Sequence, residues 1–76
     1  MSRLRHAYRN PHETILHLMK KSDAFWLEDI RFNGGVIKSA TVTQVGIGWI
    51  EVQEKGSDRL TWINTEHVTS LSIVEG

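Results

Sequence analysis

The sequence contains no cysteine and no long apolar run. Without cysteine the chain has neither disulfides nor thiolate zinc sites, and it suits a reducing compartment. No stretch reaches the roughly 20 apolar residues of a membrane span, and the arginine-rich start lacks the apolar segment of a signal peptide. We therefore expect a soluble, cytoplasmic protein with no membrane contact.

The chain is short, at 76 residues, which fits one small domain. At this length folding buries only about 60 % of the surface of the unfolded chain, so a folded monomer is marginally stable. Since disulfides are excluded, assembly with further copies is the natural remaining source of stability.

The formal net charge is zero, but the charges are unevenly distributed. Residues 1–22 hold five basic residues against one acidic residue, which gives +4, and residues 23–76 hold four basic and eight acidic residues, which gives −4. Residues 1–9, with Arg3, Arg5 and Arg9, therefore read as a flexible basic arm. Such an arm either contacts the phosphates of a nucleic acid or serves only as a solubilising terminus.

The segment "NPHE" at residues 10–13 has the pattern of a helix start. Asn10 is a typical N-cap, Pro11 suits the first turn, and Glu13 stands three residues after the cap. An apolar stripe follows, and Lys20 and Lys21 suit the negative end of the helix dipole. We expect a helix at about residues 11–21.

From residue 24 onward the composition favours β-strands. The segment "AFWLEDIRF" ends at "NGG", a strong hairpin signal. Alternation places Trp26, Ile30 and Phe32 on one face of this strand and Phe25 and Leu27 on the other. We expect strands at about 24–32, 36–45, 48–55, 59–64 and 68–74, within one domain at residues 10–76.

Two glycines interrupt the β-rich segment "VTQVGIGWIEV" at residues 42–52. Glycine in a strand usually marks a bulge or a tight bend. We interpret Gly46 and Gly48 as the corner between the second and third strands, where the sheet bends to close a small barrel.

This arrangement resembles the Sm-like family (Sm, Lsm and the bacterial Hfq branch). The segment "FWLEDIRFNGGVIKSATVTQVGIGWIEV" is similar to the first motif of the family, and "INTEHVTSL" at residues 63–71 is similar to the second. The chain departs from the family pattern at three points: Ala40 stands where a glycine is near-invariant, the aspartate of the first motif falls near Gly46, and the Arg or Lys of the second motif is absent.

The resemblance implies a helix followed by a strongly bent, five-stranded antiparallel barrel of the SH3-like or Sm-like kind. It further implies a closed ring of about five to seven copies, in which the fourth strand pairs with the fifth strand of a neighbour. Family members bind single-stranded RNA and are not enzymes. The resemblance makes Ile47, Trp49, Asn64 and Thr65 candidate RNA contacts.

The residues themselves leave alternatives open at these positions. Trp49 either stacks on a base or packs against the protein, and Asn64 and Thr65 either read base edges or serve as ordinary turn residues. Trp62 packs inside or at a subunit junction, and Trp26 is expected in the core.

The sequence has no motif for catalysis, for a cofactor or for a metal. His12 and His17 are five residues apart, so they lie on different faces of a helix and do not form the zinc-protease pair. No nucleophile elbow or phosphate loop is present. We expect a non-enzymatic RNA-binding ring, and the alternative is a small barrel that serves as a protein-interaction or assembly module.

Overall fold

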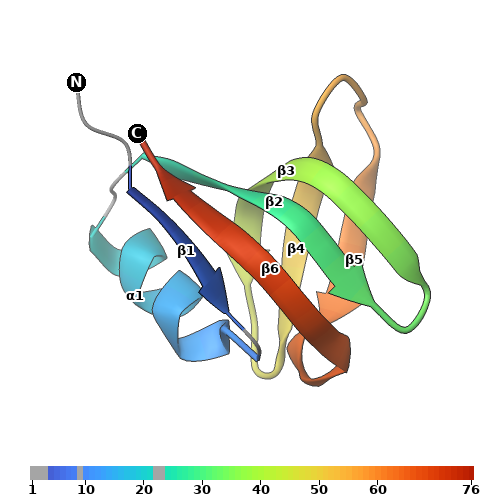
Figure 1. Cartoon of the computed structure of the whole chain (residues 1–76), viewed down its shortest axis with the longest axis horizontal. Helices are drawn as coiled ribbons and strands as arrows, with labels where there is room; N and C mark the ends of the chain where they lie inside the picture. The colour runs from blue at the N-terminus through green and yellow to red at the C-terminus, as the bar shows by residue number, and fades with distance from the viewer. Residues whose placement is uncertain (1–3, 9, 22–23) are drawn as a thin grey trace.

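The computed structural model describes residues 4–8, 10–21 and 24–76. In chain order the elements are β1 (Leu4–Tyr8), α1 (His12–Lys21), β2 (Phe25–Phe32), β3 (Gly35–Val45), β4 (Trp49–Glu54), β5 (Leu60–Asn64), the 3₁₀ turn η1 (Thr65–His67) and β6 (Val68–Glu75). The expected fold class is confirmed, because one helix is followed by five antiparallel strands (Figure 1).

The strands form one antiparallel sheet in the order β1-β6-β2-β3-β4-β5. The sheet curls upon itself: β1, β6 and β2 lie in front in Figure 1, β4 and β5 lie behind, and β3 curves from one layer to the other. The result is a small, barrel-like fold. The helix α1 lies beside β1 at one side of it.

The corner of the sheet lies at Ala40, in the middle of β3. On one side Ala40 is the last residue of β3 to pair with β2, opposite Leu27, and on the other it is the first to pair with β4, opposite Glu54. Its side chain is 1 % exposed and belongs to the core. A small residue allows the two halves of the curled sheet to approach each other closely here.

Three irregularities in the strand pairing add to the curvature. In the pairing of β2 with β6 the register shifts between Glu28 and Arg31 and again between Arg31 and Phe32, and Asp29 adopts a left-handed φ of 52°. In β3 the register shifts between Val42 and Gln44. Such bulges bend a strand and increase its twist locally.

The bulge in β2 overturns the predicted assignment of faces. Leu27 and Ile30 were expected on opposite faces, yet both are fully buried in the same core. The irregular residue Asp29 changes the phase of the alternation, so that the strand presents Leu27 before the bulge and Ile30 after it to the interior.

Gly46 and Gly48 have a different role from the one predicted. They lie in a hairpin turn between β3 and β4, closed by a bond from Gly46 N–H to Trp49 O of 2.9 Å. The chain therefore reverses at the expected place. The curvature that closes the sheet, however, lies at Ala40 and at the register shifts in the pairings of β2 with β6 and of β3 with β4.

The helix begins one residue later than its expected cap implies. The N–H of Ile15 donates to the carbonyl of Pro11 at 3.1 Å, which makes Pro11 the capping residue by its backbone. Asn10 has a φ of 53°, outside the extended range typical of an N-cap.

Among the described residues no helix is long and apolar enough to cross a membrane.

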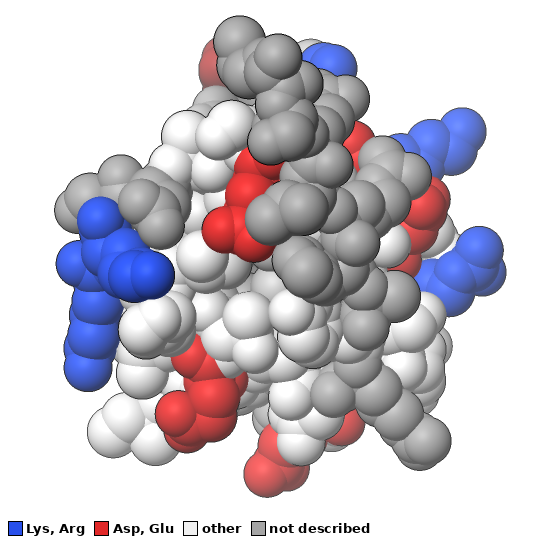
Figure 2. Space-filling view, turned by 60° about the vertical axis from the view of Figure 1, so that its left-hand side comes forward, with Lys and Arg blue, Asp and Glu red and all other residues white. Residues whose placement is uncertain are grey.

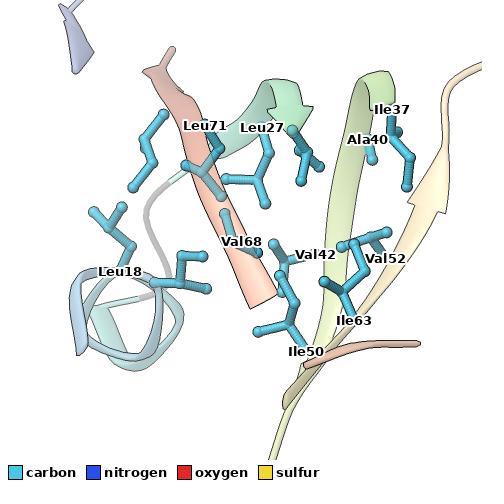
Figure 3. Close-up of a cluster of buried hydrophobic side chains, with 13 residues drawn as sticks. Leu18, Leu27, Ile37, Ala40, Val42, Ile50, Val52, Ile63, Val68 and Leu71 are labelled. Carbon is cyan, nitrogen blue, oxygen red and sulfur yellow. The ribbon is translucent and has the colours of Figure 1, made fainter. Parts of the chain in front are cut away.

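The core joins the helix to the interior of the curled sheet. Ile15 and Leu18 of α1 pack into the same cluster as side chains from all five strands β2 to β6. The labelled side chains in Figure 3 point toward one another from the helix and from both layers. The cluster contains Ile15, Leu18, Leu27, Ile30, Ile37, Ala40, Val42, Ile50, Val52, Ile63, Val68, Leu71 and Ile73.

The segment expected as a flexible arm contains a strand. Residues 4–8 form β1, which pairs antiparallel with β6 from Leu4 opposite Glu75 to Tyr8 opposite Leu71. The expected ring uses the outer edge of β6 as the acceptor for the fourth strand of a neighbour, which is β5 here. Within this chain, β1 already occupies that edge.

We predict that Ala40→Leu destabilises the protein by about 1–3 kcal/mol, because three added carbons have no space at the corner of β3. Urea unfolding monitored by circular dichroism measures the change. The matched control is Thr41→Leu, on the same strand but exposed, which should change the free energy of unfolding by less than about 0.5 kcal/mol. Equal effects of the two substitutions would contradict the corner assignment.

Candidate functional site

Two turns far apart in the sequence meet at one end of the sheet. They are the hairpin turn at residues 46–48 and η1 at residues 65–67. Both the backbone N–H and the hydroxyl of Thr65 donate to the carbonyl of Gly48, at 3.0 and 3.1 Å. These bonds hold the segment after β5 against the turn before β4.

The helix is attached to the same place. The Nε2 of His12 lies 2.7 Å from the carbonyl oxygen of Gly46. A carbonyl only accepts hydrogen bonds, so this nitrogen carries the proton and donates it. His12 therefore links the start of α1 to the hairpin turn.

The feature with a binding capacity is the aromatic pair of Trp49 and Trp62. Their ring centroids lie 5.2 Å apart and the rings are inclined by 26°, a stacked arrangement. Trp49 is half-buried, whereas Trp62 is 70 % exposed. Each ring comes from the outer surface of its own strand, since the neighbours Ile50 and Ile63 point into the core.

The carboxylate of Glu51 fixes the outer ring. One oxygen accepts a hydrogen bond from the indole N–H of Trp62, its cross-strand partner. The other oxygen accepts from the Thr43 hydroxyl at 2.8 Å. Because its edge is held in this way, the exposed face of Trp62 forms a pre-oriented flat surface.

The inner ring explains why residue 46 is glycine. A Cβ at this position would collide with Cε2, Cζ2 and Nε1 of Trp49, so the indole lies directly over the backbone of Gly46. Gly48 has open space around it but a φ of 75°, which residues with a Cβ rarely adopt. The first glycine makes room for the ring and the second makes the turn.

The predicted RNA contacts differ widely in accessibility. Ile47, at the tip of the hairpin turn, is 99 % exposed. Asn64 is exposed, but its side-chain oxygen accepts from the Glu66 N–H at 2.9 Å and caps η1. Thr65 is 1 % exposed and its hydroxyl is bonded within the protein, so a base cannot reach it.

The predicted basic contacts lie mostly beyond what the structure describes. Arg3 and Arg9 are outside the described residues. Arg5 lies in β1, opposite Val74, and only its backbone is described. The structure therefore does not place any of the three beside the aromatic pair.

The segments that carry the aromatic pair are acidic in sequence. Residues 43–51 and 62–67 contain Glu51 and Glu66 but neither lysine nor arginine. Figure 2 shows the side of the molecule that lies at the left in Figure 1, where basic side chains lie toward the edges of the view and acidic side chains lie between them. Within the described part of the chain, no group of three or more His, Asp or Glu is placed to hold a metal ion.

A groove of about 610 Å³ lies elsewhere, where β2 and β3 diverge. Its lining includes Phe25 and Trp26 of β2, Thr41 of β3, Glu54 at the end of β4, and Lys55, which follows β4. Trp26, expected in the core, is half-buried beside it and donates to Glu28 at 2.8 Å. The groove is at the far end of β4 from Trp49 and is separate from the aromatic pair.

The sequence left the location of Trp62 open, and two signals in it would have decided the matter. Ile63 follows it in an alternating strand, so an inward Ile63 requires an outward Trp62. Glu51 stands in the neighbouring strand at the level where an indole N–H needs an acceptor. The second signal becomes usable only when β4 and β5 are known to pair in the register that places Glu51 opposite Trp62.

No protein-family model, curated protein or solved structure matches the chain.

We predict that Gly46→Ala separates the two stacked rings, because the added methyl group displaces the Trp49 indole. The near-ultraviolet circular dichroism that arises from coupled tryptophans should be lost, and stability should fall by about 1–3 kcal/mol. Gly48→Ala is the control: it strains the same turn, at a cost of about 1 kcal/mol, without touching either ring. An unchanged spectrum in Gly46→Ala would show that the ring does not rest on this glycine.

Proposed function

We propose that this protein is an Sm-like protein that assembles into a ring and binds single-stranded RNA. The observation that carries the proposal is the aromatic pair, in which a half-buried Trp49 supports a Trp62 that is 70 % exposed. Proteins that bind single strands without strict sequence preference stack bases on exposed aromatic rings of this kind.

The proposed contact surface differs from the one that the resemblance implied. Trp62 provides the stacking face, and Trp49 serves as its support. Ile47 adds an exposed apolar side chain at the hairpin tip, and the exposed Asn64 lies directly across from Trp49 in the sheet. Thr65 holds the two turns together and makes no contact with RNA.

The RNA phosphates need positive charge from another part of the protein. The segments that carry the aromatic pair, residues 43–51 and 62–67, contain the acidic residues Glu51 and Glu66 and no lysine or arginine. The proposal assigns this part to Arg3, Arg5 and Arg9, from the same copy or from the next copy in the ring. Stacking is insensitive to salt, whereas phosphate contacts weaken steeply as salt rises. The two contributions are therefore separable by experiment.

The fold supports the assembly part of the proposal. The strand order β1-β6-β2-β3-β4-β5 leaves β5 as one edge strand of the sheet and β1 as the other. A ring of about five to seven copies would cover such edges. The proposal includes a cytoplasmic location, where single-stranded RNA is available, and assigns the protein no catalytic activity and no cofactor.

A second candidate is a small barrel that binds a protein partner. The observation that favours it is the acidic surrounding of the aromatic pair, since Glu51 and Glu66 repel phosphate and attract cationic side chains. Arginine and lysine side chains also bind well to tryptophan faces. This candidate predicts that the chain has no affinity for RNA at any salt concentration.

We predict that Trp62→Ala weakens binding of a U-rich or A-rich oligonucleotide about tenfold or more at every salt concentration, since one base–aromatic stack contributes about 1–3 kcal/mol. Replacing Arg3, Arg5 and Arg9 by Gln should instead reduce the dependence of affinity on salt. Fluorescence anisotropy measures both effects.

The matched control is Val36→Ala, which removes an exposed apolar side chain at the other end of β3 and should leave the affinity unchanged. Light scattering on each variant separates loss of assembly from loss of contact. If the full chain binds no oligonucleotide at low salt, the RNA proposal is wrong. An unaltered affinity in Trp62→Ala would reject the site.

A further inference from the structure

The sheet ends in two edge strands of equal length, β1 and β5, each of five residues. They are the first and last strands of the order β1-β6-β2-β3-β4-β5, and Figure 1 shows them on opposite sides of the molecule. An unpaired edge is a template for pairing with another chain. This molecule therefore has two such templates that cannot pair with each other within one copy.

The strand β5 lacks the features that keep an edge from associating. Its sequence, "LTWIN", has no charged residue and no proline, and the structure shows no bulge in its pairing with β4. Leu60 and Trp62 are 52 % and 70 % exposed. Monomeric proteins usually protect an edge with lysine, proline or a bulge, so β5 is suited to a partner strand.

The strand β6 is not available as that partner. Its edges are taken by β2 on one side and by β1 on the other, in register over five residue pairs with β1. Pairing β5 with β6 of a neighbour would require β1 to be removed first, with loss of its backbone hydrogen bonds. Pairing β5 with the outer edge of β1 requires no such loss.

Charge favours the same choice. By sequence, residues 1–9 carry three arginines and no acidic residue. The strand β5 is flanked by the exposed Asp58 and Glu66 and lies beside Glu51, against the one cation Arg59. In sequence, the segment that contains β1 is therefore opposite in charge to the segments that flank β5, which favours contact between unlike edges and disfavours the contact of two β5 strands.

We infer that the copies join head to tail by pairing β5 of one copy with β1 of the next, so that the N-terminal strand is a permanent part of the interface. A contact between two different surfaces of this kind closes into a ring when its rotation allows. This inference specifies the assembly within the proposed function and does not depend on RNA binding, because it is tested in the absence of RNA.

Charge reversal in the full-length chain tests the inference. One variant carries Arg3→Glu, Arg5→Glu and Arg9→Glu, and the other carries Asp58→Lys with Glu66→Lys. Each should raise the concentration at half-assembly about tenfold, as measured by light scattering, because like charges then face each other. The chain that carries both sets of substitutions should reach half-assembly at the same concentration as the natural chain. Glu13→Lys, an exposed change on α1, is the control and should have no effect.

Crosslinking identifies the strands, since the natural chain has no cysteine. Single variants are Ala7→Cys in β1, Thr61→Cys in β5 and Ser72→Cys in β6. They are mixed in pairs and oxidised to disulfides, which form only where two Cα atoms lie within about 7 Å and therefore not between strands two places apart. The inference requires a dimer between the β1 and β5 variants. A dimer between the β6 and β5 variants, or of the β5 variant with itself, would overturn it, as would a natural chain that stays monomeric.

The outcome is distinguishable from failure of the proposed function. A chain that assembles through β1 and β5 but binds no oligonucleotide would support the interface and refute the RNA role. A chain that binds RNA and crosslinks through β6 would keep the proposed function and refute the interface.

Discussion

The fold depends on the corner at Ala40, where one long strand leaves one partner and joins another. If the sheet of this short chain were flat, its single ten-residue helix would be too small to cover one face of it. By curling at Ala40 and at the bulges in β2 and β3, the sheet covers its own inner face. The helix then needs to cover only what remains open, which it does with Ile15 and Leu18.

The same curl determines what is left on the outside. Because Ile50, Val52 and Ile63 turn inward, the alternate residues of β4 and β5 must face out, and these include Trp49, Glu51 and Trp62. Two turns joined by Thr65 and Gly48 hold this end of the sheet in place. The aromatic pair on the outer face of β4 and β5 and the uncharged edge of β5 therefore lie next to each other.

How far the sequence determines the structure differs between elements. The helix and the five strands β2 to β6 follow from local patterns: capping residues, periodicity and turn residues act within a few positions. The phase change at Asp29 does not follow, because strict alternation gives no reason for a bulge there. The strand β1 also escaped notice, since "LRHAY" has a weak pattern of its own and becomes a strand by pairing with β6.

The sequence by itself determined the helix, the strands β2 to β6, their order and the presence of glycine at a tight place near residue 46. Only the tertiary structure decided that Gly46 accommodates an indole, that Thr65 is a buried bridge, and that Trp62 is exposed. Each of these depends on which strands become neighbours and in what register. Such information arises from contacts between residues far apart in the chain, whereas a local pattern records only what each segment favours alone.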